Sequence, residues 1–172
     1  MDRLDLRKDF AEILAYVADR VRTFDPKSND GPGKGKGKLV KFIEVGYQCD
    51  QAGWVALIFD TRPDAEPDGE WNAHIEGNTL DRPDWLSAFE GLEGGPLVVV
   101  LPDGKERKLR KGSFDKLTTI LGELLRDVLL KAKADGILAR LPKAPGCEVG
   151  VEEHDGAYGW PVYEERGREN LA

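Results

Sequence analysis

The strongest constraint on the fold is a run of aliphatic residues with helical spacing over residues 113–134. Its apolar members are Leu117, Ile120, Leu121, Leu124, Leu125, Val128 and Leu129. They recur at i, i+3, i+4 and i+7, so they form one stripe of an amphipathic helix that other apolar surface must cover. Ser113 stands where an N-cap is expected. We therefore predict a long leucine-rich helix that packs on a sheet.

Two further helices are predicted. Apolar residues keep the helical period over residues 6–24, and Pro26 ends this helix because the residue before a proline is kept out of the helical region. A short helix is expected later in the chain, with Asp81 as its N-cap, Pro83 in its first turn and Gly91 at its end.

Segments rich in Val, Ile, Phe, Tyr and Trp predict the strands of a sheet. They are residues 39–48, 54–61, 70–76, 96–101, 105–111 and 147–153. The first two are expected to form a hairpin, and the basic segment 105–111 is expected at an exposed edge because Leu109 is its only apolar residue. Strands and helices do not alternate regularly along the chain. This order predicts a single α+β domain over residues 1–172 with a largely antiparallel sheet.

Charge is unevenly distributed along an acidic chain. The 172 residues carry a net charge of -7, and the pI is near 5.0. Basic residues nevertheless cluster at residues 34–41 and 105–111, while acids cluster at residues 60–76 and 148–169. Patches of opposite sign influence partners and encounter rates and say nothing about the fold.

The first residues and the lack of a long apolar run favour a cytoplasmic protein without a membrane partner. The first residues carry charges of both signs and no apolar signal-peptide core, and nowhere do about 18 apolar residues follow one another.

Cys49 and Cys147 lie far apart and are interpreted as two buried thiols. We expect residues 25–38 to form a flexible loop rich in glycine and lysine, and residues 164–172 to form a frayed tail.

No catalytic or cofactor-binding motif is complete in the sequence. The glycine-lysine loop departs from the P-loop pattern because Lys38 is followed by Leu39 where Ser or Thr is required, and it leads from a helix into a strand. The chain has no Gly-x-Ser-x-Gly elbow and no His-Glu-x-x-His motif. We therefore assign no catalytic residue, expect no cofactor, and favour a binding function over an enzymatic one.

A metal-dependent enzyme remains an alternative because the two histidines lie among carboxylates. His74 and Glu76 share one face of the predicted strand 70–76, and His154 follows two glutamates. If the closing strand lay beside strand 70–76, these three side chains would converge as metal ligands of a hydrolase site. Two exposed histidines without a bound metal are the competing interpretation.

The closing segment combines aromatic and acidic residues. The candidate partner-binding residues are Tyr158, Trp160, Tyr163, Glu164 and Glu165. Tyrosine and tryptophan are common at the centres of protein interfaces, and acids around them steer a basic partner. The competing interpretation is that Tyr158 and Trp160 fasten the tail to the protein's own core.

A third possibility is an anion or nucleic-acid binder that uses the basic segments. The residues concerned are Lys34, Lys36, Lys38, Lys105, Arg107 and Lys108. The glycine-lysine loop has no interleaved aromatic residues for base stacking, and the net negative charge of the chain opposes the approach of phosphates. A nucleic-acid partner is therefore not favoured.

The layout of the chain resembles small uncharacterised bacterial α+β domains, some of which are immunity proteins of polymorphic toxin systems. The resemblance rests on the helix at residues 6–24, the strand at 54–61, the leucine-rich helix and the closing stretch 152–163 with Asp155-Gly156 and Tyr158-Gly159-Trp160-Pro161. It implies a non-enzymatic binding protein, and it identifies no functional residue.

Overall fold

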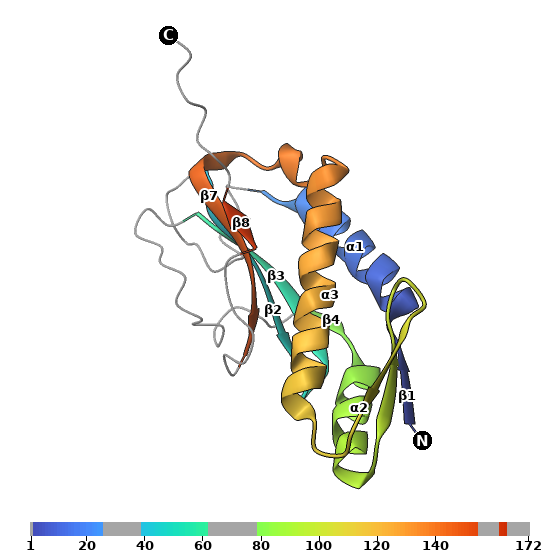
Figure 1. Ribbon diagram of the computed structural model, residues 1–172. Helices are drawn as coiled ribbons and strands as arrows, with labels where there is room; N and C mark the ends of the chain where they lie inside the picture. Colours follow the sequence, from blue (N-terminus) through green and yellow to red (C-terminus); the bar gives the residue numbers. More distant parts are fainter. Residues whose placement is uncertain (1, 26–38, 62–78, 155–161, 165–172) are drawn as a thin grey trace.

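The computed structural model describes residues 2–25, 39–61, 79–154 and 162–164. Over these residues the chain has the predicted α+β fold, with its strands in two sheets (Figure 1). Antiparallel strand pairs outnumber parallel ones in the described part, as the sequence predicts. The predicted loop 25–38, the predicted strand 70–76 and the predicted tail 164–172 lie almost entirely outside the described residues.

Within the described residues the larger sheet has five strands. They are β2 (Val40–Gln48), β3 (Trp54–Asp60), β4 (Thr79–Asp81), β7 (Lys143–Glu153) and β8 (Tyr163–Glu164), in the order β4-β3-β2-β7-β8. The predicted hairpin is confirmed, since β2 and β3 pair in antiparallel orientation. On its other side β2 pairs with β7 in parallel orientation, which places two strands from opposite halves of the chain next to each other at the centre of the sheet.

Two helices cover one face of this sheet. α1 (Leu6–Thr23) and α3 (Phe114–Ala134) contact each other, and the 3-10 turn η2 (Leu138–Arg140) leads from α3 into β7 (Figure 1). The Tyr47 hydroxyl of β2 donates a hydrogen bond of 2.7 Å to the Thr118 carbonyl of α3. At the other end of the sheet the rings of Phe24 and Phe59 meet edge to face, with centroids 5.0 Å apart.

The leucine stripe of α3 supplies much of the core. Its residues Leu117, Leu121, Leu125 and Leu129 are fully buried. Each such side chain stabilises the fold by about 2 kcal/mol when it leaves water. The prediction that this stripe packs on a sheet is confirmed, because the stripe and the inward residues of β2, β3 and β7 belong to one hydrophobic cluster.

The smaller sheet consists of β1 (Asp2–Asp5), β5 (Leu97–Val100) and β6 (Glu106–Leu109), in the order β1-β5-β6. β5 pairs with β1 in parallel and with β6 in antiparallel orientation. β6 is shorter than the predicted segment 105–111, but the prediction that it forms an exposed edge strand is confirmed. It lies at the edge of the sheet, and only Leu109 among its residues is buried.

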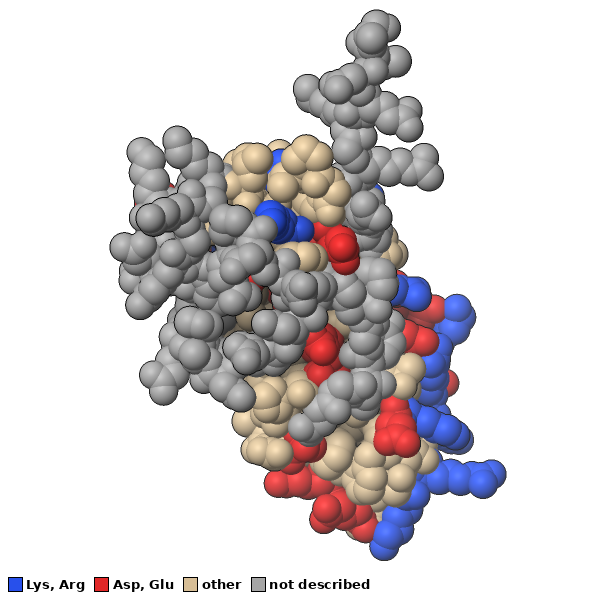
Figure 2. Space-filling view, turned by 90° about the vertical axis from the view of Figure 1, so that its left-hand side faces the viewer, with Lys and Arg blue, Asp and Glu red and all other residues tan. Residues whose placement is uncertain are grey.

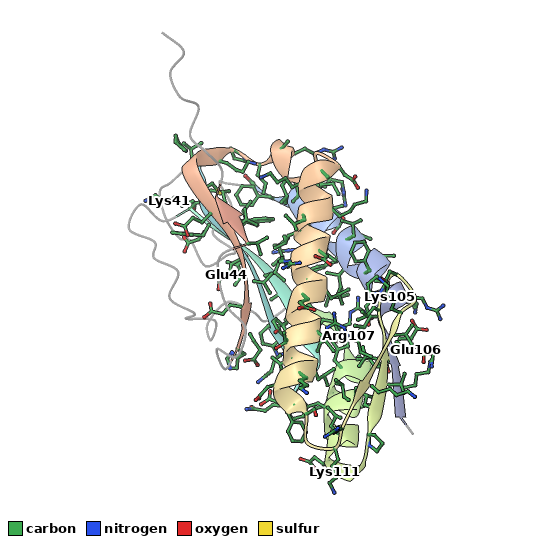
Figure 3. All side chains as sticks on the ribbon, in the orientation of Figure 1. Lys41, Glu44, Lys105, Glu106, Arg107 and Lys111 are labelled. Carbon is green, nitrogen blue, oxygen red and sulfur yellow. The ribbon has the colours of Figure 1, made fainter. Side chains whose placement is uncertain are left out.

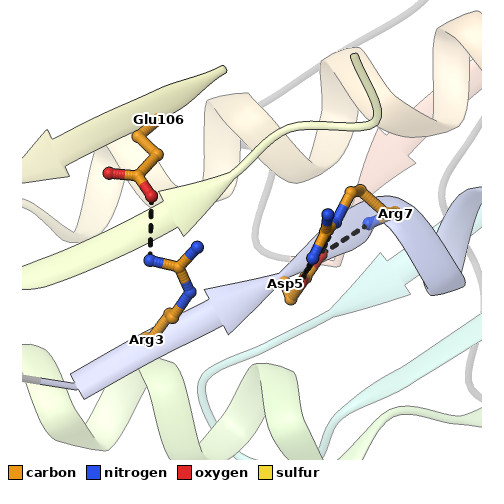
Figure 4. A network of polar contacts seen from close by, with 4 residues as sticks. All are labelled: Arg3, Asp5, Arg7 and Glu106. Atoms are coloured by element: carbon orange, nitrogen blue, oxygen red, sulfur yellow. Dashed lines mark hydrogen bonds and ion pairs between the residues drawn. The ribbon is translucent and has the colours of Figure 1, made fainter. Parts of the chain in front are cut away.

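Charged side chains cover one side of β5. The register sets Arg3 and Asp5 of β1, and Glu106 of β6, on the same side of the sheet as Val98 and Val100. Arg3 Nη1 donates to Glu106 Oε1 at 2.9 Å across the intervening strand, and Arg7 bonds Asp5 beside it (Figure 4). Val98 and Val100 are buried. Long charged side chains therefore shield apolar surface here while their ends stay in solvent.

α2 (Pro83–Gly94) begins and ends later than the sequence predicts. Its N-cap is Arg82 in place of Asp81, because Asp81 is the last residue of β4 and pairs with β3. The helix also continues past Gly91. Ser113 does occupy the N-cap position of α3, but its side chain makes no capping hydrogen bond.

A buried polar network joins α1 to α2. Arg82 is 7% exposed, and its Nη1 donates to Glu12 Oε2 at 2.8 Å while its Nε lies 3.7 Å from Asp9 Oδ1. Trp85 Nε1 donates to Asp9 Oδ2 at 3.1 Å. Burial raises the pKa of Asp9, although the Trp85 hydrogen bond and the Arg82 charge act to lower it.

Candidate functional site

The face of the five-stranded sheet that is turned away from α1 and α3 carries most of its polar side chains. Strand residues alternate between two faces, so the outward positions follow from the register. We call this surface the outer face, and its members are Phe42, Glu44, Gln48, Trp54, Ile58, Asp60, Glu148 and Glu152. The intervening residues of the same strands point inward to the core, where Ile43, Val45 and Val149 are fully buried.

Four carboxylates from three strands lie on the outer face. Phe42 of β2 stands between Asp60 of β3 and Glu148 of β7, and the next outward position on β2 is Glu44. Glu152 lies further along β7. These residues are far apart in the sequence, so the parallel pairing of β2 with β7 is what assembles the group. Glu44, Glu148 and Glu152 keep part of their surface in solvent, whereas Asp60 is 6% exposed.

Figure 2 looks at the side on which β7 and β8 lie, and several described Asp and Glu residues are visible on it. The described Lys and Arg residues gather mainly along one edge of that view. Lys41 is an exception, because Figure 3 shows it with Glu44 on the side of the sheet away from α3. Among the described residues, the register gives the outer face the carboxylates of Glu44, Asp60, Glu148 and Glu152, and Lys41 lies near its margin.

Aromatic and apolar side chains accompany the carboxylates. Trp54 Nε1 donates to Gln48 Oε1 at 2.9 Å, which fixes the indole at the end of the hairpin. The His154 ring meets the Trp54 ring edge to face at 6.0 Å, and the His154 backbone N–H donates to the Tyr47 carbonyl at 2.9 Å. Phe42 and Ile58 add partly exposed apolar surface nearer the carboxylates. This mixture matches protein interfaces, in which aromatic and apolar contacts sit among polar groups.

Only one of the three predicted metal ligands falls within the described residues. His154 lies at the end of β7 against Trp54, while His74 and Glu76 are outside the described ranges. Within those ranges, no group of three or more His, Cys, Asp and Glu side chains is placed to hold a metal ion. The metal site therefore stays a prediction.

The predicted partner-binding tail is described in part. Tyr163 and Glu164 form β8 and pair with Val149 and Glu148 of β7. Tyr158, Trp160 and Glu165 lie outside the described residues. The tail strand is thus attached to the sheet directly beside Glu148, one of the four carboxylates of the outer face.

Some of the basic candidate residues lie outside the described ranges and the others lie within them. Lys34, Lys36 and Lys38 lie outside the described residues. Lys105 Nζ lies 2.6 Å from Asp103 Oδ2, and Arg107 Nη1 lies 3.3 Å from Glu123 Oε2. Lys108 is exposed on β6. Neighbouring acids therefore already offset the charge of two of the three described cations.

The sequence analysis assigned no site residue on β2 or β3, so it missed the apolar and aromatic members of the outer face on these strands and also its polar members Glu44, Gln48 and Asp60. The signal of the three polar residues was present, because each directly follows an apolar residue in a segment that was predicted to be a strand. What the sequence lacked was the register between β2 and β7, which alone brings Glu44 and Asp60 to Glu148.

No family model matches the chain, and neither a curated protein nor a solved structure matches it. In the part of the chain that the structure describes, no helix is both long enough and apolar enough to span a bilayer.

Proposed function

We propose that this protein is a non-enzymatic, cytoplasmic binding domain whose outer face docks a basic protein. The observation that supports the proposal is the register of β3, β2 and β7, which puts Asp60 and Glu148 on either side of Phe42 and Glu44 at the next outward position of β2, all on one surface. A cluster of carboxylates with flanking aromatic residues favours a partner that presents Lys or Arg around an apolar patch.

The charge of the whole chain supports the same kind of partner. A net charge of -7 attracts a basic protein at long range, and the local carboxylates then orient it on the outer face. Proteins that act on nucleic acids carry basic clefts, so an acidic domain that covers such a cleft would inhibit them. This is the chemistry expected of an immunity-like protein, to which the chain has a resemblance in layout.

The test is capture of a partner from a lysate of the cells that make the protein. The wild type is compared with two doubly substituted variants, Glu148→Lys with Glu152→Lys on the outer face, and Glu90→Lys with Glu93→Lys on the exposed side of α2. Both variants change the net charge by the same amount. Circular dichroism confirms that each variant is folded.

We expect the wild type and the α2 variant to retain one basic protein in stoichiometric amount, released by added salt, and the outer-face variant to lose it. Retention of that protein by the outer-face variant would refute the proposal. Equal loss from both variants would show that net charge alone drives the association.

A further inference from the structure

β6 is an edge strand, and no second strand pairs with its outer side among the described residues. The sheet order is β1-β5-β6, so β6 pairs with β5 alone (Figure 4). The Leu101 N–H donates to the Lys105 carbonyl at 2.8 Å, so the backbone of Lys105 points toward β5. Backbone groups alternate in direction along an antiparallel strand, so the N–H and C=O groups of Glu106 and Lys108 point away from β5. Two donors and two acceptors therefore lie in a row along the free edge.

Three cations at the end of β6 keep a charge that no acid offsets. The first part of the basic segment 105–111 is neutralised, because Lys105, Glu106 and Arg107 all take part in ion pairs. The other cations of the segment are exposed, and none of them forms an ion pair with another described residue. They are Lys108, Arg110 and Lys111. Figure 3 shows Lys111 beyond the end of β6, opposite to the end at which Lys105 lies.

The free edge and the unpaired cations together select one kind of occupant. A row of alternating donors and acceptors matches the backbone of an extended peptide, which adds a strand to the sheet. Phosphate oxygens only accept hydrogen bonds, so a nucleic acid would leave the Glu106 and Lys108 carbonyls unmatched. The unpaired cations favour acidic side chains in the added strand. A second copy of this edge is opposed, because the segment 105–111 holds five cations and one carboxylate and repels its own kind.

We propose that β6 binds an acidic segment of a partner protein, which joins the smaller sheet as a strand antiparallel to β6. Its backbone exchanges hydrogen bonds with Glu106 and Lys108. Two acidic side chains of the segment, two positions apart, contact Lys108 and Arg110 and set the register. The residue between them points to the opposite face of the sheet. The inference does not depend on the outer face, because the two surfaces share no residue.

The test uses the acetylated and amidated pentapeptide Glu-Val-Glu-Val-Thr as the probe. In the proposed register its first residue lies opposite Arg110 and its third residue lies opposite Lys108. The peptide is titrated into the ¹⁵N-labelled full-length protein, and binding is followed by amide chemical shifts.

Three matched peptides separate the backbone from the charge. Methylation of the third backbone nitrogen removes an N–H that points toward β6, whereas methylation of the fourth removes an N–H that points away. Both methylated peptides keep the charge of the probe. The third peptide, Lys-Val-Lys-Val-Thr, keeps the backbone and reverses the charge.

Two doubly substituted proteins complete the comparison. Lys108→Glu with Arg110→Glu reverses the charge of the edge. Lys133→Glu with Arg140→Glu alters two exposed cations at the end of α3 and in η2, and it changes the net charge by the same amount. Circular dichroism confirms that each variant is folded.

We expect saturable shifts at residues 105–111 with the probe, and downfield shifts of the Glu106 and Lys108 amide protons as they form hydrogen bonds. Methylation at the third nitrogen should weaken binding at least about fivefold more than methylation at the fourth. The charge-reversed peptide and the edge variant should each bind about tenfold more weakly, while the control variant binds as the wild type does. Glu148→Lys with Glu152→Lys should leave the affinity within about twofold, so this proposal and the proposed function fail independently.

Several outcomes would overturn the assignment. Absence of saturable shifts at millimolar peptide, or unchanged binding by the edge variant, would exclude the site. Equal affinities of the two methylated peptides would show attraction by charge without an added strand. Tighter binding of the RNA pentauridylate at the same amides would assign the edge to nucleic acid. A change of these amide signals when the protein alone is diluted would assign it to a second copy of this chain.

Discussion

Asp9 is a buried acid whose ionisation opposes folding. It is 9% exposed, and burial raises its pKa above the ordinary value of 3.8 in spite of Trp85 and Arg82. When the pH is below the pKa of Asp9 in both the unfolded and the folded state, the residue is protonated in both states, and its burial then carries no free-energy cost of ionisation. As pH rises, the unfolded chain releases its proton first, so stability falls until pH exceeds the folded pKa.

Asp9→Asn removes this dependence, because the amide cannot ionise and its oxygen still accepts the Trp85 hydrogen bond. We predict that the unfolding free energy of the wild type, relative to that of the variant, decreases as pH rises from below the ordinary pKa of 3.8 to the raised pKa of the folded state, and is constant above that range. Urea titrations followed by circular dichroism across this range measure the difference. A difference that is flat, or that increases with pH, would contradict the assignment.

Arg82 neutralises the buried end of this network. Replacement by alanine leaves the Asp9 carboxylate buried without its cation, so Arg82→Ala should lower the unfolding free energy by about 3 kcal/mol. Arg126→Ala is the matched control, because the pair of Arg126 with Asp127 is exposed and its loss should change stability by less than about 0.5 kcal/mol. Urea unfolding of both variants gives the comparison, and a loss below about 1 kcal/mol for Arg82→Ala would show that the network does not hold the helices together.

At the scale of elements, the β2–β3 hairpin is held against the start of α2 by a close backbone contact. The Gly53 carbonyl accepts a hydrogen bond of 2.6 Å from the Arg82 N–H. A Cβ atom placed on Gly53 would lie 1.7 Å from the Arg82 carbonyl oxygen. No side chain can therefore be added there unless the two backbones separate.

Gly53→Ala should lower the unfolding free energy by about 2 to 3 kcal/mol, because the added methyl group forces these backbones apart. Gly94→Ala serves as the control, since a Cβ on Gly94 meets no atom within 4 Å and alanine at the end of α2 restricts the unfolded chain. Thermal unfolding of both variants distinguishes them. Equal melting temperatures for the two would refute the close contact.

The elements with strong periodicity were predictable from the sequence. α1 and α3 follow from their apolar stripes, and the β2–β3 hairpin follows from two apolar runs on either side of a short turn. β1 was missed because Leu4 is its only apolar residue and the strand gains its place by pairing with β5. The start of α2 was misplaced because pairing with β3 keeps Asp81 in a strand.

Only the acidic and aromatic composition of the candidate site was predictable from the sequence. Acidity and aromatic residues near the closing segment pointed to a basic protein partner, and β8 attaches part of that segment beside Glu148. The location of the outer face depends on the parallel pairing of β2 with β7, whose residues are distant in sequence. No local pattern encodes that register, so Glu44 and Asp60 could not be joined to Glu148 in advance.

At the scale of the whole molecule, charge is sorted between two surfaces. The outer face carries several carboxylates, whereas the edge strand β6 and its flanks carry exposed basic residues. Such sorting orients an approaching charged partner before contact. It also means that the position of a charge, and not only the net charge, should control the rate of association.

The most direct test of the account is the association rate of the captured basic partner, measured by stopped flow over a range of ionic strength. We predict that Glu148→Lys with Glu152→Lys lowers the rate about tenfold at low salt and flattens its salt dependence, while Glu90→Lys with Glu93→Lys leaves most of the rate intact. Equal rates for these two variants, which carry the same net charge, would contradict the claim that the outer face is the docking surface.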